Sequence, residues 1–376
     1  EAGFSAEGLS KVDEQLSQMS LPAVLVVHHG NVVYSSGNLS RRFMCHSVRK
    51  SIMSAMYGIY EDQGDIALNS TLKSLGIDDK EGLTETEKQA TILNLLTAKS
   101  GIYHPAAYEP RGMSESRPER GSARPGEQFF YNNWDFNVLL TIIEQEAHIN
   151  FFEAVKQRIA DQIGLEDFRL EDTEYRFDPE SEHAAYLFKL STRDLARFGQ
   201  LYLQKGQWNG VQIIPEDWVD RSTKAFATNL PGFEGRGGYG MLWWVDDHGF
   251  SEPCYYASGL GGHRVYVFPE SDIVIVTRAN TYLFQFESSE KIDALVQLVL
   301  DAKSSSGMAN PLIEPLSELV IQHQIKGETN VDFTRYLGTY NHRFFGEINA
   351  VEINGQPYLK GKILGSFRVF AQSDDT

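Results

Sequence analysis

The chain has few cysteines, few basic residues and no long apolar run. Two cysteines, Cys45 and Cys254, occur among 376 residues, which excludes a disulfide scaffold and a zinc site made of cysteines alone. Lys and Arg total 34 against 51 Asp and Glu, and the net charge of −17 argues against nucleic acid and anionic membranes as partners. No stretch reaches the about 20 apolar residues of a membrane span. We expect no membrane insertion, and two buried, unpaired thiols in preference to a disulfide.

Several familiar site patterns are also missing. The sequence has no Gly-x-Ser-x-Gly elbow, no Gly-x-Gly-x-x-Gly motif and no phosphate-binding loop, which leaves an α/β-hydrolase triad or a nucleotide site without support. His28 and His29 lie in a hairpin pattern with no further ligand cluster in register. The acidic stretch 178–183 is interpreted as a solvated loop. We therefore expect no cofactor and no metal.

Ser47 and Lys50 stand three residues apart at the start of an apolar-periodic segment that runs to Ile59. On a helix, positions i and i+3 face the same way, with Cβ atoms about 5–6 Å apart. A lysine beside a serine hydroxyl can take its proton and make it a nucleophile. The alternative is a helix cap with a solvated lysine, but the apolar residues after Lys50 indicate a buried helix. A buried lysine needs a partner or a shifted pKa.

A second pattern, Tyr131-x-Asn133, follows a Pro-Gly turn and precedes a long apolar-periodic helix. In a cleft, a nearby Lys⁺ would favour the phenolate of Tyr131, which could then relay protons. Asn133 could hold the lysine or a substrate carbonyl. The alternative is a core tyrosine followed by an Asn cap. Residues 104–126, which lead into Tyr131, are interpreted as a cleft wall or lid.

A third pattern is the glycine-rich run from Ala257 to Arg264, which precedes an alternating strand and a turn. Glycines in a strand indicate close approach by another backbone or by a ligand. The alternative is an ordinary bulge or tight strand crossing.

Together, in this order and at these separations, the three patterns resemble the serine β-lactamase and penicillin-binding-protein superfamily. The branch that looks most similar is that of the class C β-lactamase-related serine hydrolases, which includes esterases, D-aminopeptidases and nylon-oligomer hydrolases. The resemblance covers roughly residues 5–303. It implies an α+β fold (an α/β sandwich), in which helices flank an antiparallel β-sheet and a mostly helical region is added. Further stretches that resemble the family are 95–101, 191–199 and 238–244.

The resemblance also implies roles for individual residues. Ser47 would be the acylated nucleophile, Lys50 its proton acceptor or electrostatic partner, and Tyr131 the general base and acid. Asn133 would orient the substrate and Lys50. The family's third motif falls on Ala257, Ser258 and Gly259. The oxyanion hole would consist of the backbone N–H groups of Ser47 and Leu260.

The third motif departs from the family pattern in a way that bears on substrate. Penicillin-recognising members carry a lysine that pairs with the ligand carboxylate, whereas Ala257 has no charge. His263 or Arg264 could supply a substitute charge, and strand alternation lets at most one of them point at the cleft. We list His263 among the substrate-binding candidates. The expected function is hydrolysis of small esters or amides. The alternatives are a β-lactamase or D-Ala peptidase activity, and an idle binding or scaffold protein.

The chain is predicted to form a hydrolase domain over residues 1–303, with the helical region at about 67–225, and a small β-rich extension over 304–376. The extension begins with a flexible Ser-Gly junction at 304–307 and could mediate a homo-oligomer. Relatives of this kind are often exported, so we expect a periplasmic or secreted protein. Helices are predicted at 5–19, 47–62, 88–98, 134–146, 150–162, 191–204, 287–302 and 314–323. A hairpin is predicted at 23–35, and strands are predicted at 239–246, 253–258, 264–268, 272–278, 336–340, 347–353 and 358–361, with Asn354-Gly355 as a hairpin turn.

Overall fold

The computed structural model describes residues 3–228, 230, 234–303, 334, 337–342, 346–353, 356–361 and 365–368. Contacts divide the chain into two compact units, residues 1–319 and 320–376. The predicted junction at 304–307 and the predicted helix at 314–323 lie outside the described residues.

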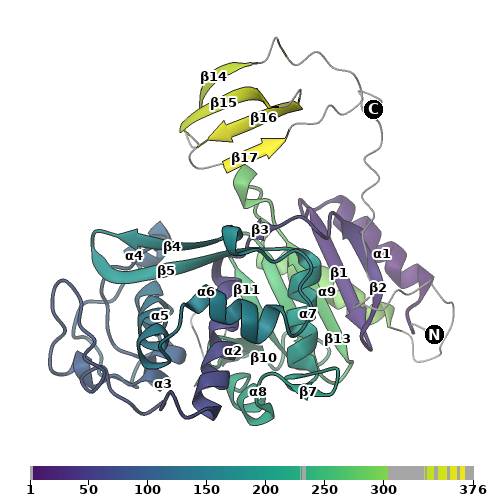
Figure 1. Cartoon of the computed structure of the whole chain (residues 1–376). Helices are drawn as coiled ribbons and strands as arrows, with labels where there is room; N and C mark the ends of the chain where they lie inside the picture. Colours follow the sequence, from purple (N-terminus) through teal and green to yellow (C-terminus); the bar gives the residue numbers. More distant parts are fainter. Residues whose placement is uncertain are drawn as a thin grey trace. The chain divides into compact units, whose positions relative to one another are not determined.

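The first unit is built on an eight-stranded antiparallel sheet with the order β2-β1-β13-β12-β11-β10-β9-β8 (Figure 1). The N-terminal hairpin joins the sheet through β1, which pairs with β13. The segment predicted as one strand at 239–246 is two strands with a break between them. The strands are β1 (Ala23–His28), β2 (Asn31–Gly37), β8 (Ala227–Thr228), β9 (Gly237–Tyr239), β10 (Trp244–Asp246), β11 (Cys254–Gly259), β12 (His263–Phe268) and β13 (Ile273–Arg278).

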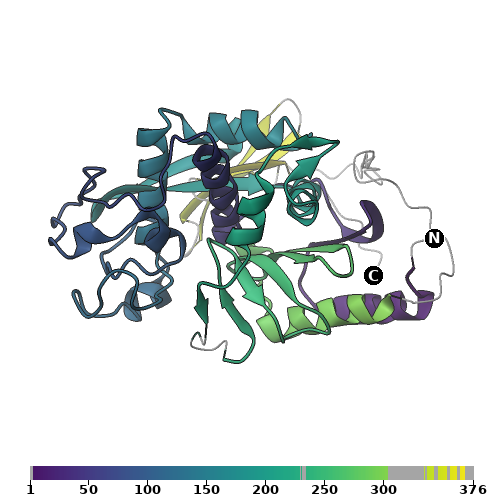
Figure 2. The ribbon, with the colours of Figure 1, turned by 90° about the horizontal axis from the view of Figure 1, so that it is seen from below.

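Helices cover both faces of this sheet, which explains why β1 and β13 are buried at every position. On one face α1 (Ala6–Ser17) and α9 (Ser289–Ala302) run side by side (Figure 2). Their apolar residues share a core with alternate strand residues, among them Val24 and Ile275. On the opposite face α7 (Thr192–Leu203) packs against the intervening residues, including Val274.

The helical region is centred on α2 (Arg49–Asp62), which follows the 3-10 turn η1 (His46–Val48). Every residue of α2 from Arg49 to Tyr60 is buried, so this helix lies inside the domain, as its apolar sequence predicts. No helix among the described residues is long and apolar enough to cross a membrane. The remaining helices are α3 (Ile92–Leu96), α4 (Arg111–Glu115), α5 (Asn133–Glu146), α6 (Phe151–Val155) with a π-helical turn at Lys156–Ala160, and α8 (Glu216–Ser222).

The region predicted as mostly helical also contains a long hairpin. Strands β4 (Thr173–Asp178) and β5 (Ser181–Leu190) pair antiparallel, and β3 (Phe43–Met44) adds to β5. The acidic stretch at 178–183 therefore spans the turn of a hairpin and its second strand instead of a solvated loop. Ser181 and His183 within it are buried. The periodicity could not reveal this hairpin, because short apolar runs suit a buried strand and a buried helix equally.

The second unit contains a four-stranded antiparallel sheet with the order β14-β15-β16-β17. Its strands are β14 (Gly338–His342), β15 (Gly346–Ile353), β16 (Gln356–Gly361) and β17 (Gly365–Arg368). The first three match the predicted strands, and β17 was not predicted. Ile353 pairs with Gln356 across the predicted Asn354-Gly355 turn, whose own residues lie outside the described range.

Candidate active site

Ser47, Lys50 and Tyr131 meet at one point in the first unit. Lys50 Nζ lies 2.8 Å from Ser47 Oγ and 2.7 Å from the Tyr131 hydroxyl. Ser47 is in η1, Lys50 is in the first turn of α2, and Tyr131 comes from the segment just before α5. The spacing of Ser47 and Lys50 at a helix start thus turns both side chains the same way. A hydroxyl, an amine and a phenol lie within proton-transfer reach.

Lys50 is buried without an opposite charge. Its side chain has 2 % exposure, and no carboxylate of the described residues forms an ion pair with it. Its Nζ lies 4.6 Å from the ring centroids of both Tyr131 and Phe136. Burial lowers the pKa of Lys50 well below its usual value, and the positive charge of Arg49 lowers it further. Both effects favour the neutral amine, which is the form able to accept a proton from Ser47.

The Tyr131 hydroxyl is held in its protonated form. Burial raises the pKa of Tyr131 to about 12, although a hydrogen bond with Ser47 and the charges of Arg49 and Arg264 act in the opposite direction. The expectation that a nearby Lys⁺ would favour the phenolate therefore fails, because burial outweighs the neighbouring charges and also disfavours the charged lysine.

Arg49 and His46, which the motif reasoning did not single out, complete the surroundings of Ser47. Arg49 is 1 % exposed, and its guanidinium lies 5.3 Å from the Tyr108 ring and 5.1 Å from the Tyr186 ring. The His46 ring nitrogens lie 2.8 Å from the Tyr108 hydroxyl and 2.9 Å from Thr281 Oγ1. Burial and the charge of Arg49 lower the pKa of His46 to about 3, so its imidazole is neutral.

The backbone at His46 is also unusual. His46 has a φ of +47°, a left-handed conformation that is uncommon for a non-glycine residue and often occurs at functional sites. It directly precedes Ser47. The only sequence signal for His46 and Arg49 is that they lie next to Ser47 and Lys50.

Asn133 lies at the cleft but does not bond to Lys50. Its Nδ2 donates to the Tyr108 carbonyl at 2.6 Å. Its Oδ1 is buried and has no hydrogen-bond partner among the described residues. The predicted contact between Asn133 and Lys50 is therefore not formed, and the Oδ1 of Asn133 is left without a partner among the described residues.

Strand alternation divides the third motif into two faces. Ser258 pairs with Arg264 across β11 and β12, and both line the cleft together with Leu260. Ala257 and His263 are buried, with exposures of 1 % and 0 %, and do not line the cleft. The assignment of Ala257 and His263 to substrate binding is therefore wrong. Of the two residues considered as a substitute charge, His263 and Arg264, it is Arg264 that lines the cleft.

Gly259 lies where β11 comes closest to the backbone before Ser47. Gly259 pairs with His263, and a Cβ on Gly259 would lie 2.6 Å from the Cys45 carbonyl oxygen and 3.2 Å from His263 Cβ. A glycine is therefore required for β11 to approach the backbone just before Ser47. Ser47 and Leu260, which follow Cys45 and Gly259 in the chain, line the same cleft.

The cleft has a volume of about 530 Å³. Residues 104–126, predicted as a cleft wall, contribute four of its lining residues. The lining consists of His46, Ser47, Arg49, Tyr108, Glu109, Pro110, Met113, Tyr131, Asn133, Trp244, Ser258, Gly259, Leu260, Gly261, Gly262, Arg264, Glu287 and Ser289.

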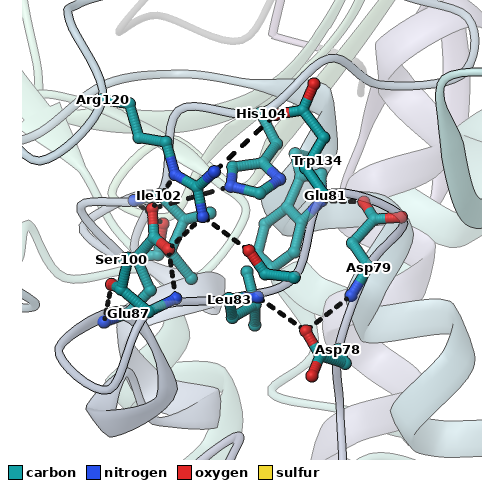
Figure 3. A network of polar contacts seen from close by, with 12 residues as sticks. Asp78, Asp79, Glu81, Leu83, Glu87, Ser100, Ile102, His104, Arg120 and Trp134 are labelled. Atoms are coloured by element: carbon teal, nitrogen blue, oxygen red, sulfur yellow. Dashed lines mark hydrogen bonds and ion pairs between the residues drawn. The ribbon is translucent and has the colours of Figure 1, made fainter.

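A second buried polar cluster holds the start of α5 from the other side (Figure 3). Trp134 Nε1 donates to Asp79 Oδ2 at 2.6 Å, and Ser181 Oγ donates to the same oxygen at 2.9 Å. Glu87 accepts two hydrogen bonds from Arg120, at 2.9 and 3.0 Å. Burial alone would raise the pKa of both carboxyl groups, but these hydrogen bonds lower it below the usual value. The cluster fixes Trp134, three residues after Tyr131.

Cys45 and Cys254 are both buried and unpaired. Burial raises the pKa of each thiol, which keeps both in the unreactive form. Among the described residues, no group of three His, Cys, Asp or Glu side chains is arranged to hold a metal ion.

Comparison with known proteins relates this arrangement to a single family. The family model described as Beta-lactamase matches residues 12–298. Among solved structures, a candidate 6-aminohexanoate-dimer hydrolase from Bacillus anthracis is similar at 24% identity and a TM-score of 0.60, covering 77% of this chain and 80% of that one.

Two other solved structures are similar at lower identity. An octameric penicillin-binding protein homologue from Pyrococcus abyssi has 18% identity and a TM-score of 0.59, covering 96% of this chain and 89% of that one. A beta-lactamase from Mycobacterium bovis has 18% identity and a TM-score of 0.55, covering 77% and 97%. At these identities the solved structures establish the fold.

Proposed function

The chain belongs to the beta-lactamase family, and on that premise we propose that it is a serine hydrolase that cleaves small carboxylic esters or amides through an acyl-enzyme on Ser47. The observation that carries the proposal is the position of Lys50 Nζ, 2.8 Å from Ser47 Oγ and 2.7 Å from the Tyr131 hydroxyl. A buried lysine without a carboxylate partner has little use in stability, since an unpaired buried charge is costly.

In the proposed acylation step, Ser47 Oγ attacks the carbonyl carbon and its proton passes to the neutral amine of Lys50. The carbonyl oxygen becomes an oxyanion and accepts hydrogen bonds from the N–H groups of Ser47 and Leu260. When the ester or amide bond breaks, the leaving oxygen or nitrogen takes the proton of the Tyr131 hydroxyl. The Lys50 ammonium then returns a proton to Tyr131.

Deacylation reverses these proton movements. Water attacks the acyl carbon, and its proton moves through Tyr131 to Lys50. Ser47 Oγ leaves and recovers a proton from the Lys50 ammonium, while the acid product departs. We assign the base to Lys50 and the relay to Tyr131, because a phenol with a pKa of about 12 keeps its proton near neutral pH.

The preference for simple esters and amides over β-lactams rests on the third motif. Ala257 carries no charge and is buried, so the position that bears the carboxylate-pairing lysine in penicillin-recognising relatives offers no anchor here. The Oδ1 of Asn133 has no hydrogen-bond partner among the described residues, and its use as an acceptor for a substrate N–H is part of the proposal and would favour amides. The similar Bacillus anthracis protein is a candidate hydrolase of the 6-aminohexanoate dimer. The competing function is β-lactam or D-Ala peptide cleavage.

We make two further proposals, on the cellular location and on the oligomeric state. We place the protein in the periplasm or outside the cell, as relatives of this kind often are. We also propose that the C-terminal extension supports a homo-oligomer, because a neighbour that covers nearly the whole chain is described as octameric.

The proposed function is tested by covalent labelling. After treatment with a fluorophosphonate, we expect mass spectrometry to find one adduct, on the peptide that contains Ser47, and hydrolysis of p-nitrophenyl acetate to stop. Ser47→Ala is expected to abolish both. Ser258→Ala, which removes another cleft hydroxyl, is the matched control and should still be labelled on Ser47. A native chain that forms no adduct and turns over no ester would point to a binding protein.

A further inference from the structure

Two arginines at the cleft contact the backbone on either side of the proposed oxyanion hole. Arg49 Nη1 donates to the carbonyl oxygen of His46 at 3.0 Å. Arg264 Nη1 donates to the carbonyl oxygen of Gly259 at 2.9 Å. Both arginines line the cleft, and neither forms an ion pair with a carboxylate of the described residues. Most other arginines of the first unit do form such ion pairs, for example Arg120 and Arg193.

These two carbonyls belong to the peptide groups that supply the oxyanion donors. The peptide between His46 and Ser47 carries the His46 carbonyl on one side and the Ser47 N–H on the other, because a trans peptide points the two groups in opposite directions. The peptide between Gly259 and Leu260 does the same for the Leu260 N–H. Among the described residues, the Leu260 N–H has no acceptor of its own.

A cation that donates to the carbonyl oxygen of a peptide group makes the N–H of the same group a stronger hydrogen-bond donor. A charge-assisted hydrogen bond to the carbonyl oxygen draws electron density towards that oxygen, which makes the N–H a stronger donor. It also fixes the plane of the peptide, so that the N–H points at the oxyanion without reorganisation. Both arginines thus act on the reaction through the backbone, while their guanidinium groups need not touch the substrate.

The local structure supports this role at each position. The left-handed backbone of His46 is a conformation that needs external support, and Arg49 supplies one bond to it from within α2. Arg264 Nη1 also donates to the His263 carbonyl at 3.1 Å, and its Nη2 lies 3.3 Å from Ser289 Oγ. Arg264 therefore ties the end of β11 to the start of β12, at the bend that presents Leu260.

We propose that Arg49 and Arg264 are a matched pair of positioning residues, each of which orients and polarises one of the two peptides that donate to the oxyanion. This inference rests on the proposed function, since it requires an oxyanion at Ser47. It extends that function, because the two cleft arginines would stabilise the transition state of every substrate and would not serve to bind an anionic group of a particular substrate.

Arg264→Met is the cleaner test, because Arg49 acts on the pKa of both Lys50 and Tyr131, whereas of these two groups Arg264 acts on Tyr131 alone. One oxyanion donor is worth about 10²–10³-fold in rate, and polarisation by a neighbouring hydrogen bond changes a bond by about 10–30 %. We therefore expect Arg264→Met to lower kcat for p-nitrophenyl acetate by about twofold to tenfold with little change in KM. Arg264→Lys, which keeps a charge and one donor, should recover part of the loss.

The binding affinity of boronic acids separates a role in the oxyanion hole from a purely structural role. A boronate on Ser47 places a tetrahedral oxygen in the oxyanion hole, and phenylboronic acid and 3-carboxyphenylboronic acid differ only by a carboxylate. We expect Arg264→Met to weaken both by the same factor. The control is Arg158→Met, which removes an exposed arginine that bonds Gln63 and should leave both affinities unchanged.

The outcomes are distinct. Weaker binding of the carboxylate compound alone would make Arg264 a substrate-anion anchor and overturn the proposal. Unchanged kcat and unchanged affinities would overturn it as well. If Arg264→Met does not fold, the comparison of Arg264→Lys with Arg264→Gln carries the same test. A native chain that neither hydrolyses the ester nor binds phenylboronic acid refutes the proposed function itself, and the role of the arginines falls with it.

Discussion

Two buried polar clusters meet at the start of α5, and they differ in whether the charged or the neutral forms of their ionisable side chains are stabilised. Around Asp79 and Glu87, each carboxylate accepts several hydrogen bonds from neighbours such as Trp134 and Arg120 (Figure 3). Around Ser47, the side chains of Lys50 and Arg49 are buried without a carboxylate partner in the described part of the chain. The first cluster resembles a structural network and the second resembles a reactive site.

The difference follows from what each arrangement does to the pKa values. Hydrogen bonds in the carboxylate cluster lower the pKa of Asp79 and Glu87, which stabilises their charged forms. In the Ser47 cluster, burial moves the pKa of Lys50 down and that of Tyr131 up, which stabilises the neutral forms. A neutral amine beside a neutral phenol and a hydroxyl can exchange protons readily.

The largest effect is expected from Lys50→Met, which removes the unpaired amine. Loss of the proton acceptor should lower kcat/KM for p-nitrophenyl acetate by about 10²–10⁴-fold. The Tm should stay the same or rise, because a buried amine is replaced by an apolar side chain of similar length. Ester hydrolysis and thermal unfolding measure the two effects. A large fall in Tm would mean that Lys50 is structural, and the contrast between the clusters would vanish.

The pH dependence of kcat/KM should follow the protonation state of Lys50. Below its lowered pKa the lysine is an ammonium and cannot accept a proton, so kcat/KM should fall about tenfold for each pH unit. The rate should reach a plateau above that pKa and decline only as Tyr131 loses its proton near pH 12. A rate that keeps rising until about pH 10, the ordinary range of a lysine, would contradict the account.

Glu87→Ala tests the carboxylate cluster. It removes the buried carboxylate to which Arg120 donates two hydrogen bonds and leaves Arg120 with Glu81, at 3.7 Å, as its carboxylate partner, so we expect a loss of about 2–4 kcal/mol in the free energy of unfolding. Activity per folded molecule should change little. The matched control is Glu85→Ala, which breaks the exposed pair with Lys73 and should cost less than about 1 kcal/mol. Equal losses in the two variants would show that burial of Glu87 is unimportant.

The last prediction concerns Asp135, a buried carboxyl that accepts a hydrogen bond from Ser100 at 2.6 Å. Burial raises the pKa of Asp135 to about 8. The unfolded chain then releases its proton at a lower pH than the folded one, so this group makes stability fall as the pH rises from about 4 to about 8. Asp135→Asn should remove that slope, and its gain in Tm should be larger at pH 8 than at pH 5. A gain independent of pH would exclude a neutral carboxyl.

Sequence reasoning succeeded where the chemistry is local. Ser47 and Lys50 share one helix start, so their spacing alone predicts that they meet, and the resemblance located Tyr131. It failed where side-chain direction depends on register, since Ala257 and His263 turn inward and Arg264 turns to the cleft. Arg49 and His46 belong to no motif, because their roles depend on ring contacts and backbone carbonyls supplied by distant segments. The β4–β5 hairpin was missed because its apolar run is too short to show a period.

The charge state of Lys50 is the most direct test of the central claim, which is that burial beside Ser47 keeps this amine neutral. Lysine side chains labelled with ¹³C and ¹⁵N can be titrated by NMR, and the signal of Lys50 can be assigned by its absence in Lys50→Met. We expect Lys50 to lose its proton at a pH well below that of the exposed lysines, which remain charged until about pH 10. A Lys50 signal that titrates together with the exposed lysines would contradict the account.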